Sequence, residues 1–226
     1  ERGHIVLPAR RQTPTNRMVQ RKVDDVAHDT APIEDALSAL RPLRLINVSE
    51  APECEPLYRC LLARYHYLGY KSPIGENQKY LVFDPLGRPL GCVLFGSSSW
   101  SCADRDAYVG WGRESRARNL QFTTNNTRFL ILPWVKVPHL ASHILSQVSR
   151  RVAPDWQRRY GHPVYLLETF VDTARFKGTC YRAANWQAVG VTRGRSRNDR
   201  YTRLRVSPKS IWLYPLIRDF HDKLNA

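Results

Sequence analysis

The sequence predicts an α+β fold in which helices flank a mixed β-sheet, preceded by an extended basic arm. Three observations predict it. Hydrophobic residues make up 42% of the 226 residues, which is enough to build a core. A β-hairpin pattern comes first, and strand-like and helix-like segments then alternate as is typical of a right-handed crossover. We expect the arm over residues 1–32 and a single domain over residues 33–226.

The first half of the domain is predicted to contain a helix followed by a hairpin. Apolar residues recur at three- and four-residue spacing from Leu57 to Leu68, which gives a helix one apolar face, and Gly69 then provides a stop. Proline and glycine at the second and fourth positions of the turn that begins at Asp84 fit a type I turn. The expected elements are a short helix at 34–40, the helix at 57–68, and strands at 43–48, 79–83, 88–95 and 108–111.

The second half alternates buried strands with helices. Pro138 is well placed to open a helix whose apolar face runs from Leu140 to Val152. Continuous apolar runs on either side of this helix are typical of buried strands. The expected elements are strands at 128–135 and 163–171, the helix between them, a short helix at 181–187 and a last strand.

The charge balance favours a polyanionic partner. Lysine and arginine number 35 and aspartate and glutamate number 20, which leaves a formal net charge of +15. Such an excess is most often found in proteins that bind nucleic acid, although anionic membranes and acidic proteins also attract basic chains. No run of about 18 apolar residues is present, so the sequence predicts no membrane-spanning helix.

The five cysteines indicate a reducing compartment, and we expect a cytoplasmic protein. They are odd in number and none forms a Cys-x-x-Cys pair, so neither a disulfide framework nor a structural zinc site is expected. A chain of this length can also bury a core without covalent cross-links. We therefore predict free thiols, most of them packed inside the protein.

An arginine-rich segment at residues 192–205 is the strongest local feature. Its six arginines face a single acidic residue, Asp199, and would repel one another without an anionic partner. Guanidinium groups bind phosphate oxygens and stack on bases, so we predict a nucleic-acid contact, with a solvated charged loop as the alternative. The predicted DNA-binding residues are Arg182, Arg193, Arg195, Arg197, Arg200, Arg203 and Arg205.

Two carboxylates stand in and just after the strand predicted at 163–171. Glu168 and Asp172 are four residues apart, so they share one face of an extended strand. Together with Asp106 they are candidate ligands for Mg²⁺ or Mn²⁺, which would polarise a phosphodiester and generate a hydroxide nucleophile. The alternative is that Glu168 pairs with an arginine while Asp172 caps the next helix.

Three further candidates complete the predicted catalytic set. Tyr181 is a candidate nucleophile for a strand-transfer reaction or a stacking platform, although packing is the commoner role of a tyrosine. Tyr181 and Asn185 are expected to position a nucleic-acid strand near the carboxylates. His66 is a candidate general base, with an ordinary structural histidine as the alternative.

Seven blocks of the sequence carry a family resemblance: Tyr65–Tyr70, Arg105–Trp111, Arg128–Pro133, Leu140–Ser142, Glu168–Asp172, Gly178–Trp186 and Thr192–Arg195. In this order they resemble the DruA family of the Druantia anti-phage systems, over roughly Pro32 to Pro215. Relatives of that family accompany mobile elements and are often labelled transposase-like. The resemblance implies a bacterial, cytoplasmic protein that acts on DNA in defence or in element mobility.

The order of the predicted elements is also similar to that of the GNAT N-acetyltransferases. That family places a glycine-rich, arginine-bearing loop after its central strand to cradle the cofactor diphosphate, whereas residues 135–142 contain no glycine and include Pro138. Three hypotheses follow, in order of preference. They are a metal-dependent nuclease that nicks or cleaves DNA, a non-catalytic DNA-binding subunit that recruits a helicase or nuclease, and a coenzyme A-dependent acyltransferase.

Overall fold

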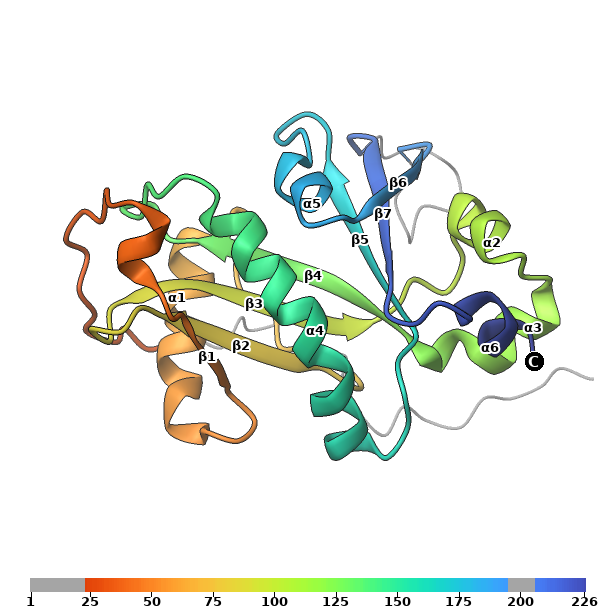
Figure 1. Cartoon of the computed structure of the whole chain (residues 1–226), viewed down its shortest axis with the longest axis horizontal. Helices are drawn as coiled ribbons and strands as arrows, with labels where there is room; N and C mark the ends of the chain where they lie inside the picture. The colour runs from red at the N-terminus through yellow and green to blue at the C-terminus, as the bar shows by residue number, and fades with distance from the viewer. Residues whose placement is uncertain (1–22, 195–205) are drawn as a thin grey trace, which may run out of the picture.

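A computed structural model describes residues 23–194 and 206–226, and it confirms the predicted α+β class. Seven strands form one mixed sheet in the order β1-β2-β3-β4-β5-β7-β6, with helices packed on it (Figure 1). Neighbouring strands are antiparallel except β4 and β5, which α4 connects as a crossover. The strands are β1 (Arg44–Asn47), β2 (Gln78–Phe83), β3 (Pro89–Ser97), β4 (Thr123–Ile131), β5 (Leu166–Asp172), β6 (Gln187–Val191) and β7 (Lys209–Pro215).

Two helices pack on opposite faces of the sheet. Lys79 of β2 contacts Glu55 of α1 at 2.7 Å, whereas the hydroxyl of the next residue, Tyr80, donates to Asp155 of α4 at 2.9 Å. No helix in the described residues is long and apolar enough to cross a bilayer. The α-helices are α1 (Glu55–Tyr65), α2 (Ala103–Val109), α3 (Arg113–Asn119), α4 (Leu140–Tyr160), α5 (Thr179–Ala183) and α6 (Phe220–Asn225), and the 3₁₀ helices are Leu37–Leu40, Pro52–Cys54 and Leu120–Phe122.

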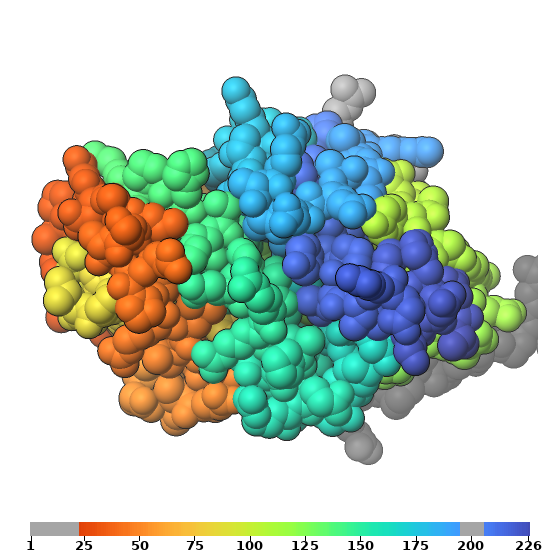
Figure 2. Space-filling view, viewed as in Figure 1, coloured from red at the N-terminus to blue at the C-terminus, as the bar shows by residue number. Residues whose placement is uncertain are grey.

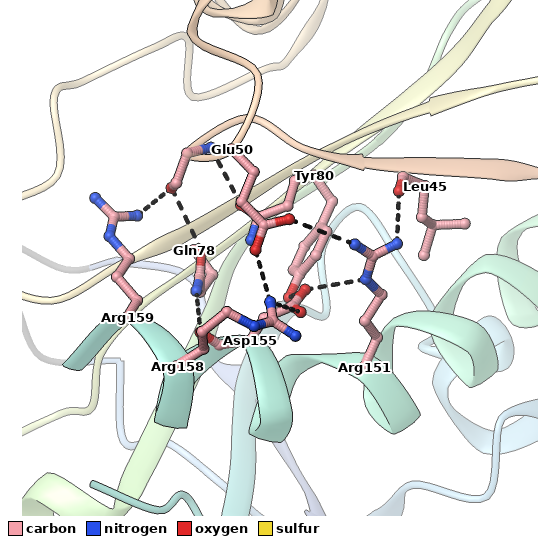
Figure 3. Close-up of polar contacts among 10 residues, drawn as sticks. Leu45, Glu50, Gln78, Tyr80, Arg151, Asp155, Arg158 and Arg159 are labelled. Atoms are coloured by element: carbon pink, nitrogen blue, oxygen red, sulfur yellow. Dashed lines mark hydrogen bonds and ion pairs between the residues drawn. The ribbon is translucent and has the colours of Figure 1, made fainter. Parts of the chain in front are cut away.

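Asp155 anchors α4 to the sheet. Its carboxylate is buried and accepts hydrogen bonds from Tyr80 of β2 and from two arginines of α4, Arg151 and Arg158, over 2.9–3.0 Å (Figure 3). The side chain of Gln78 donates to the backbone carbonyl of Asp155 at 2.9 Å. These hydrogen bonds hold α4 against the sheet. The short helix α5 packs beside α4, on the same side of the molecule (Figure 2).

The apolar core consists of two clusters. The larger joins α1 and α4 to β2, β3 and β4, and it includes Tyr58, Phe95 and Trp156. The smaller joins α2 and α6 to β5 and β7, and it includes Val109 and Leu213. All five cysteines are free and three of them are buried, which confirms the prediction of packed thiols.

Most predicted elements are found within a few residues of their expected bounds, but the strand predicted at 108–111 is wrong. Residues 103–109 form α2, which ends because Gly110 adopts the left-handed conformation with φ 81°. Trp111 then turns inward, and its indole N–H donates to the Leu224 carbonyl at 2.6 Å. The sequence pattern also misses α3 and the polar first half of β4, whose side chains lack the apolar run of a buried strand.

Residues 23–32, which the sequence assigns to the arm, lie against the domain. The backbone N–H of Val26 donates to Cys60 Sγ at 3.4 Å, and His28 Nε2 lies 3.0 Å from the Tyr65 hydroxyl. The His28 ring also stacks on Trp134, with a centroid distance of 5.7 Å. The domain boundary at residue 33 stays a prediction, and residues 1–22 lie outside the described residues.

Candidate functional site

β4 and β5 pair over only three residues and then separate. The parallel ladder runs from Thr123 opposite Leu166 to Asn125 opposite Glu168. Just beyond, β4 contains a β-bulge, because Thr127 has no partner residue on β3. A bulge bends its strand and increases the local twist, which accounts for the separation. The separated ends of both strands line a cavity of about 590 Å³, a size typical of small-ligand sites.

Aromatic side chains form much of the cavity wall. Tyr67 follows α1 and Phe176 follows β5; they are 41% and 50% exposed, and their ring centroids lie 5.6 Å apart. Partly exposed rings that line a cavity stand at its mouth. Tyr65, Phe129 and Tyr181 line the same cavity. Rings of this kind offer flat surfaces on which a planar ligand can stack.

The cavity carries an excess of positive charge. Its lining, as far as the chain is described, contains three cationic side chains, Arg128, Lys177 and Lys209, and one acidic side chain, Asp172. Asp172 stands opposite Lys209 in the ladder between β5 and β7. A hydrogen bond from the Ser207 hydroxyl, together with the nearby charge of Lys209, lowers the pKa of Asp172, so this carboxylate is ionised at neutral pH. Two positive charges remain in excess.

His66 lines the cavity in its neutral form. Burial, reinforced by the nearby charge of Arg128, lowers its pKa to about 4. The Leu68 backbone N–H donates to His66 Nδ1 at 3.1 Å, so Nε2 carries the ring proton. A base with so low a pKa accepts protons poorly at neutral pH. The geometry therefore favours a hydrogen-bond donor at this position over the predicted general base.

Tyr181 forms part of the inner wall, where its hydroxyl is already engaged. That hydroxyl donates to Asn126 Oδ1 at 2.7 Å, and the Asn126 amide in turn donates to the backbone carbonyls of Leu94 and Arg128 at 3.1 and 3.0 Å. Burial raises the pKa of Tyr181, which opposes formation of a phenolate nucleophile. The structure thus supports the packing role for Tyr181, which still forms part of the cavity lining.

The metal site predicted at Glu168, Asp172 and Asp106 does not form in this structure. Glu168 is completely buried outside the cavity, where Arg105 donates to Oε2 at 2.8 Å and the Ser99 backbone N–H donates to Oε1 at 2.7 Å. The described residues contain no group of three or more histidine, cysteine, aspartate or glutamate side chains placed to hold a metal ion. The alternative pairing of Glu168 with an arginine is the arrangement found.

Asp106 belongs to the same buried network as Glu168. Arg105 donates to Asp106 Oδ1 at 2.7 Å and Arg116 donates to Oδ2 at 2.8 Å. Two carboxylates and two guanidinium groups thus alternate from β5 to α3, and both Asp106 oxygens are occupied. Asp172 lies apart from this network at the end of β5, where its Oδ1 accepts the Ala174 N–H at 3.1 Å.

The remaining predicted site residues are not gathered at the cavity. Arg182 is exposed, with its guanidinium 5.9 Å from the ring centre of Trp212, and Asn185 is exposed beside residues 214–218. Neither contacts the carboxylates, so the expected grouping with Glu168 is wrong. Arg193 is exposed and lies two residues after the end of β6. The predicted residues Arg195, Arg197, Arg200, Arg203 and Arg205 lie outside the described residues.

The two ends of the arginine-rich segment are anchored close to the cavity. The Val206 N–H donates to the Gly194 carbonyl at 3.1 Å, and Gly194 adopts φ 68°, which favours glycine there. The Thr192 N–H donates to the carbonyl of Lys209, a residue of the cavity lining, at 2.8 Å. The described residues at both ends of the segment therefore lie beside Lys209 of the cavity lining, and the predicted phosphate contact stays a prediction.

Sequence reasoning missed the residues that make this cavity distinctive. Arg128 stands between the polar first half of β4 and the apolar run that follows it, and Tyr67 and Phe176 are aromatic residues in loops. A charged residue at the start of the predicted strand at 128–135 was the one available indication. It could not reveal the cavity, because the separation of β4 from β5 depends on the bulge at Thr127.

A family comparison identifies the chain. The model of the DruA family, described as Druantia protein DruA, matches residues 5–207. The chain belongs to the DruA family. Membership confirms the expected family and gives this DruA chain its setting in anti-phage defence. No curated protein matches the chain.

Several solved structures similar to this DruA chain are acetyltransferases. Spermidine/spermine N-acetyltransferase SpeG from Vibrio cholerae, in complex with manganese ions, is 10% identical with a TM-score of 0.45, over 80% of this chain and 96% of that one. A spermidine N-acetyltransferase from Vibrio cholerae, in complex with CoA and spermine, is 10% identical, with a TM-score of 0.47 over 77% of this chain and 95% of that one. The ribosomal L7/L12 α-N-protein acetyltransferase RimL is 12% identical, with a TM-score of 0.43 over 79% and 96%.

The loop after β4 in this DruA chain does not fit a coenzyme A diphosphate. A diphosphate cradle needs free backbone N–H groups. Here the N–H groups of Val135 and Lys136 donate to the carbonyls of Leu132 and Ile33, at 2.9 and 2.8 Å. Two further positions of the loop are prolines, which have no N–H.

Proposed function

We propose that this DruA chain is a DNA-binding protein of anti-phage defence that receives one unpaired nucleotide in the cavity between β4 and β5. One observation carries the proposal: a single cavity combines aromatic rings at its mouth with an excess of positive charge. Bases stack on aromatic rings whatever their sequence, and cationic side chains contact the phosphates. A nucleotide presents both chemistries at once.

The charge of the surrounding chain supports the same function. The net charge is +15, and the ends of the arginine-rich segment adjoin Lys209 of the cavity lining. A DNA strand bound across this side of the molecule would therefore contact cationic side chains on both sides of the cavity. Positive charge arranged around an aromatic-lined site is the usual way in which proteins hold single-stranded nucleic acid.

In this function the chain binds DNA, and a recruited helicase or nuclease partner unwinds or cleaves it. The carboxylates that the sequence offers for metal binding are occupied by Arg105, Arg116 and backbone donors. His66 is neutral and the Tyr181 hydroxyl is buried. These side chains are suited to shaping the cavity, and the binding-subunit hypothesis is the one that they support.

Removal of either mouth ring is expected to weaken DNA binding. Tyr67→Ala and Phe176→Ala should each raise the Kd for a single-stranded oligodeoxynucleotide about tenfold, because stacking of one base contributes about 1–3 kcal/mol. Fluorescence anisotropy at fixed salt measures this. A duplex with one unpaired base should be bound more tightly than a fully paired duplex of the same length.

Trp100→Ala is the matched control for these variants. Trp100 is also an exposed aromatic residue, at 60%, and it lies outside the cavity lining. Its replacement should leave the Kd within twofold of the unmodified protein. If all three variants behave alike, or if the paired and unpaired substrates bind equally, the cavity is not the nucleotide site.

A further inference from the structure

Arg128 is a partly buried cation of the cavity lining, and it has no acidic partner among the described residues. Its Nε donates to the Gly69 carbonyl at 3.1 Å and its Nη1 to the Thr127 carbonyl at 2.7 Å. A guanidinium group has five N–H donors. Three of them are therefore left without an acceptor in the described part of the chain.

This arrangement favours an anionic ligand at Arg128. Burial lowers the pKa of the guanidinium, because desolvation disfavours its charged form. The group nevertheless stays charged, and its two carbonyl contacts replace only part of the lost hydration until an anion binds. The two carbonyl contacts also hold the guanidinium in place, which reduces the entropy lost when its remaining donors bind a ligand.

We infer that Arg128 binds a terminal phosphomonoester of the nucleotide in the cavity, so that the protein recognises a phosphorylated DNA end. This inference rests on the proposed function. A phosphomonoester offers three non-bridging oxygens and a charge of about −1.5 to −2, whereas an internal phosphodiester offers two such oxygens and a single charge. Three free donors and an uncompensated cation match the monoester better.

The other polar groups of the cavity agree with an anion. Lys177 and Lys209 line the cavity, and His66 presents a neutral ring whose Nε2 carries the proton. Asp172 is the one acidic side chain in the described lining, and it would repel a phosphate. Ser207 and Lys209 keep it ionised, so it offsets one of the three cations and leaves a positive excess in the described lining.

Thymidine monophosphate and thymidine test the inference without any variant. Isothermal titration at equal ionic strength should show that the monophosphate binds at least about tenfold more tightly, the gain expected for hydrogen bonds to a charged group. The 3′- and 5′-monophosphates, titrated separately, identify which DNA end is taken. Equal binding of thymidine and both monophosphates, or binding of none, would overturn the phosphate site.

Two substitutions of Arg128 test whether this residue causes the preference for the monophosphate. Arg128→Gln should reduce the advantage of the monophosphate to less than twofold, and Arg128→Lys, which keeps the charge but has fewer donors, should retain part of it. Arg150→Gln removes an exposed cation of α4 outside the cavity and should leave the advantage unchanged. A preference that survives in Arg128→Gln protein with an unchanged melting temperature would place the phosphate elsewhere.

This experiment can fail independently of the proposed function. If thymidine and its monophosphates bind equally while DNA affinity still depends on Tyr67 and Phe176, the cavity takes a nucleotide but Arg128 is not its phosphate site. If the monophosphate is preferred while replacement of Tyr67 or Phe176 leaves the DNA affinity unchanged, Arg128 binds phosphate and the proposed DNA site is wrong.

Discussion

Replacement of Arg105 by methionine is expected to lower the free energy of unfolding by about 3–5 kcal/mol, the usual cost of leaving one partner of a buried ion pair alone. The methionine keeps apolar packing near Trp111 but leaves Glu168, which is fully buried, without its counter-charge. Urea denaturation at pH 7 measures the change. A loss below about 1 kcal/mol would mean that the network does not hold β5 against α2.

The pH dependence of this variant gives an independent check. Burial raises the pKa of Glu168, and Arg105 opposes that rise. Without Arg105 the pKa in the folded state rises further above that in the unfolded state, so the folded protein binds a proton and stability is lost as pH increases. The loss of unfolding free energy in Arg105→Met, relative to the unmodified protein, should therefore be smaller at pH 5 than at pH 8. The double variant Arg105→Met with Glu168→Met should recover most of the loss at pH 8.

Neutralisation of three arginines in the segment at 192–205 is expected to weaken DNA binding and flatten its salt dependence. Each phosphate contact contributes about 0.7 to the slope of log Kd against log salt for a single strand. Arg193→Gln, Arg195→Gln and Arg197→Gln combined should therefore reduce the slope by about 2. Anisotropy titrations over a series of salt concentrations measure both quantities.

A second triple variant separates a local contact from the effect of net charge. Arg41, Arg44 and Arg150 are exposed, and Arg44 lies on β1, at the opposite edge of the sheet from β6. Their replacement by glutamine removes the same charge. The salt slope should then stay within about 0.5 of the original value. Equal slopes for the two triple variants would show that the arginine-rich segment makes no phosphate contact of its own.

Elements of the fold with a clear period or stop could be predicted from the sequence. The helix from Leu57, the turn at Asp84 and the helix after Pro138 each have a local physical cause, and each is present. The strand predicted at Tyr108–Trp111 was wrong, because the apolar pattern of a short strand also fits the last turn of a helix before Gly110. The polar start of β4 has no such pattern and is held by its neighbours in the sheet.

The candidate site was much less accessible to sequence reasoning. A metal site was predicted at Glu168 and Asp172 because their spacing places both on one face of a strand. In the structure, Arg105, which is 63 residues away in the chain, pairs with Glu168 and neutralises its charge. The cavity depends on a bulge, on the separation of two strands and on loops after α1 and β5. Such long-range arrangements leave little trace in the local pattern of residues.

Photo-crosslinking tests the central claim most directly. A single-stranded oligodeoxynucleotide that carries 4-thiothymidine is irradiated in complex with the full chain, and the modified peptides are identified by mass spectrometry. The nucleotide should attach to residues 65–68, at the end of α1 and just after it, and to residues 176–181, before and within α5, which are the two sides of the cavity. Crosslinks confined to Trp100 or to the outer face of α4, with none in those two stretches, would contradict it.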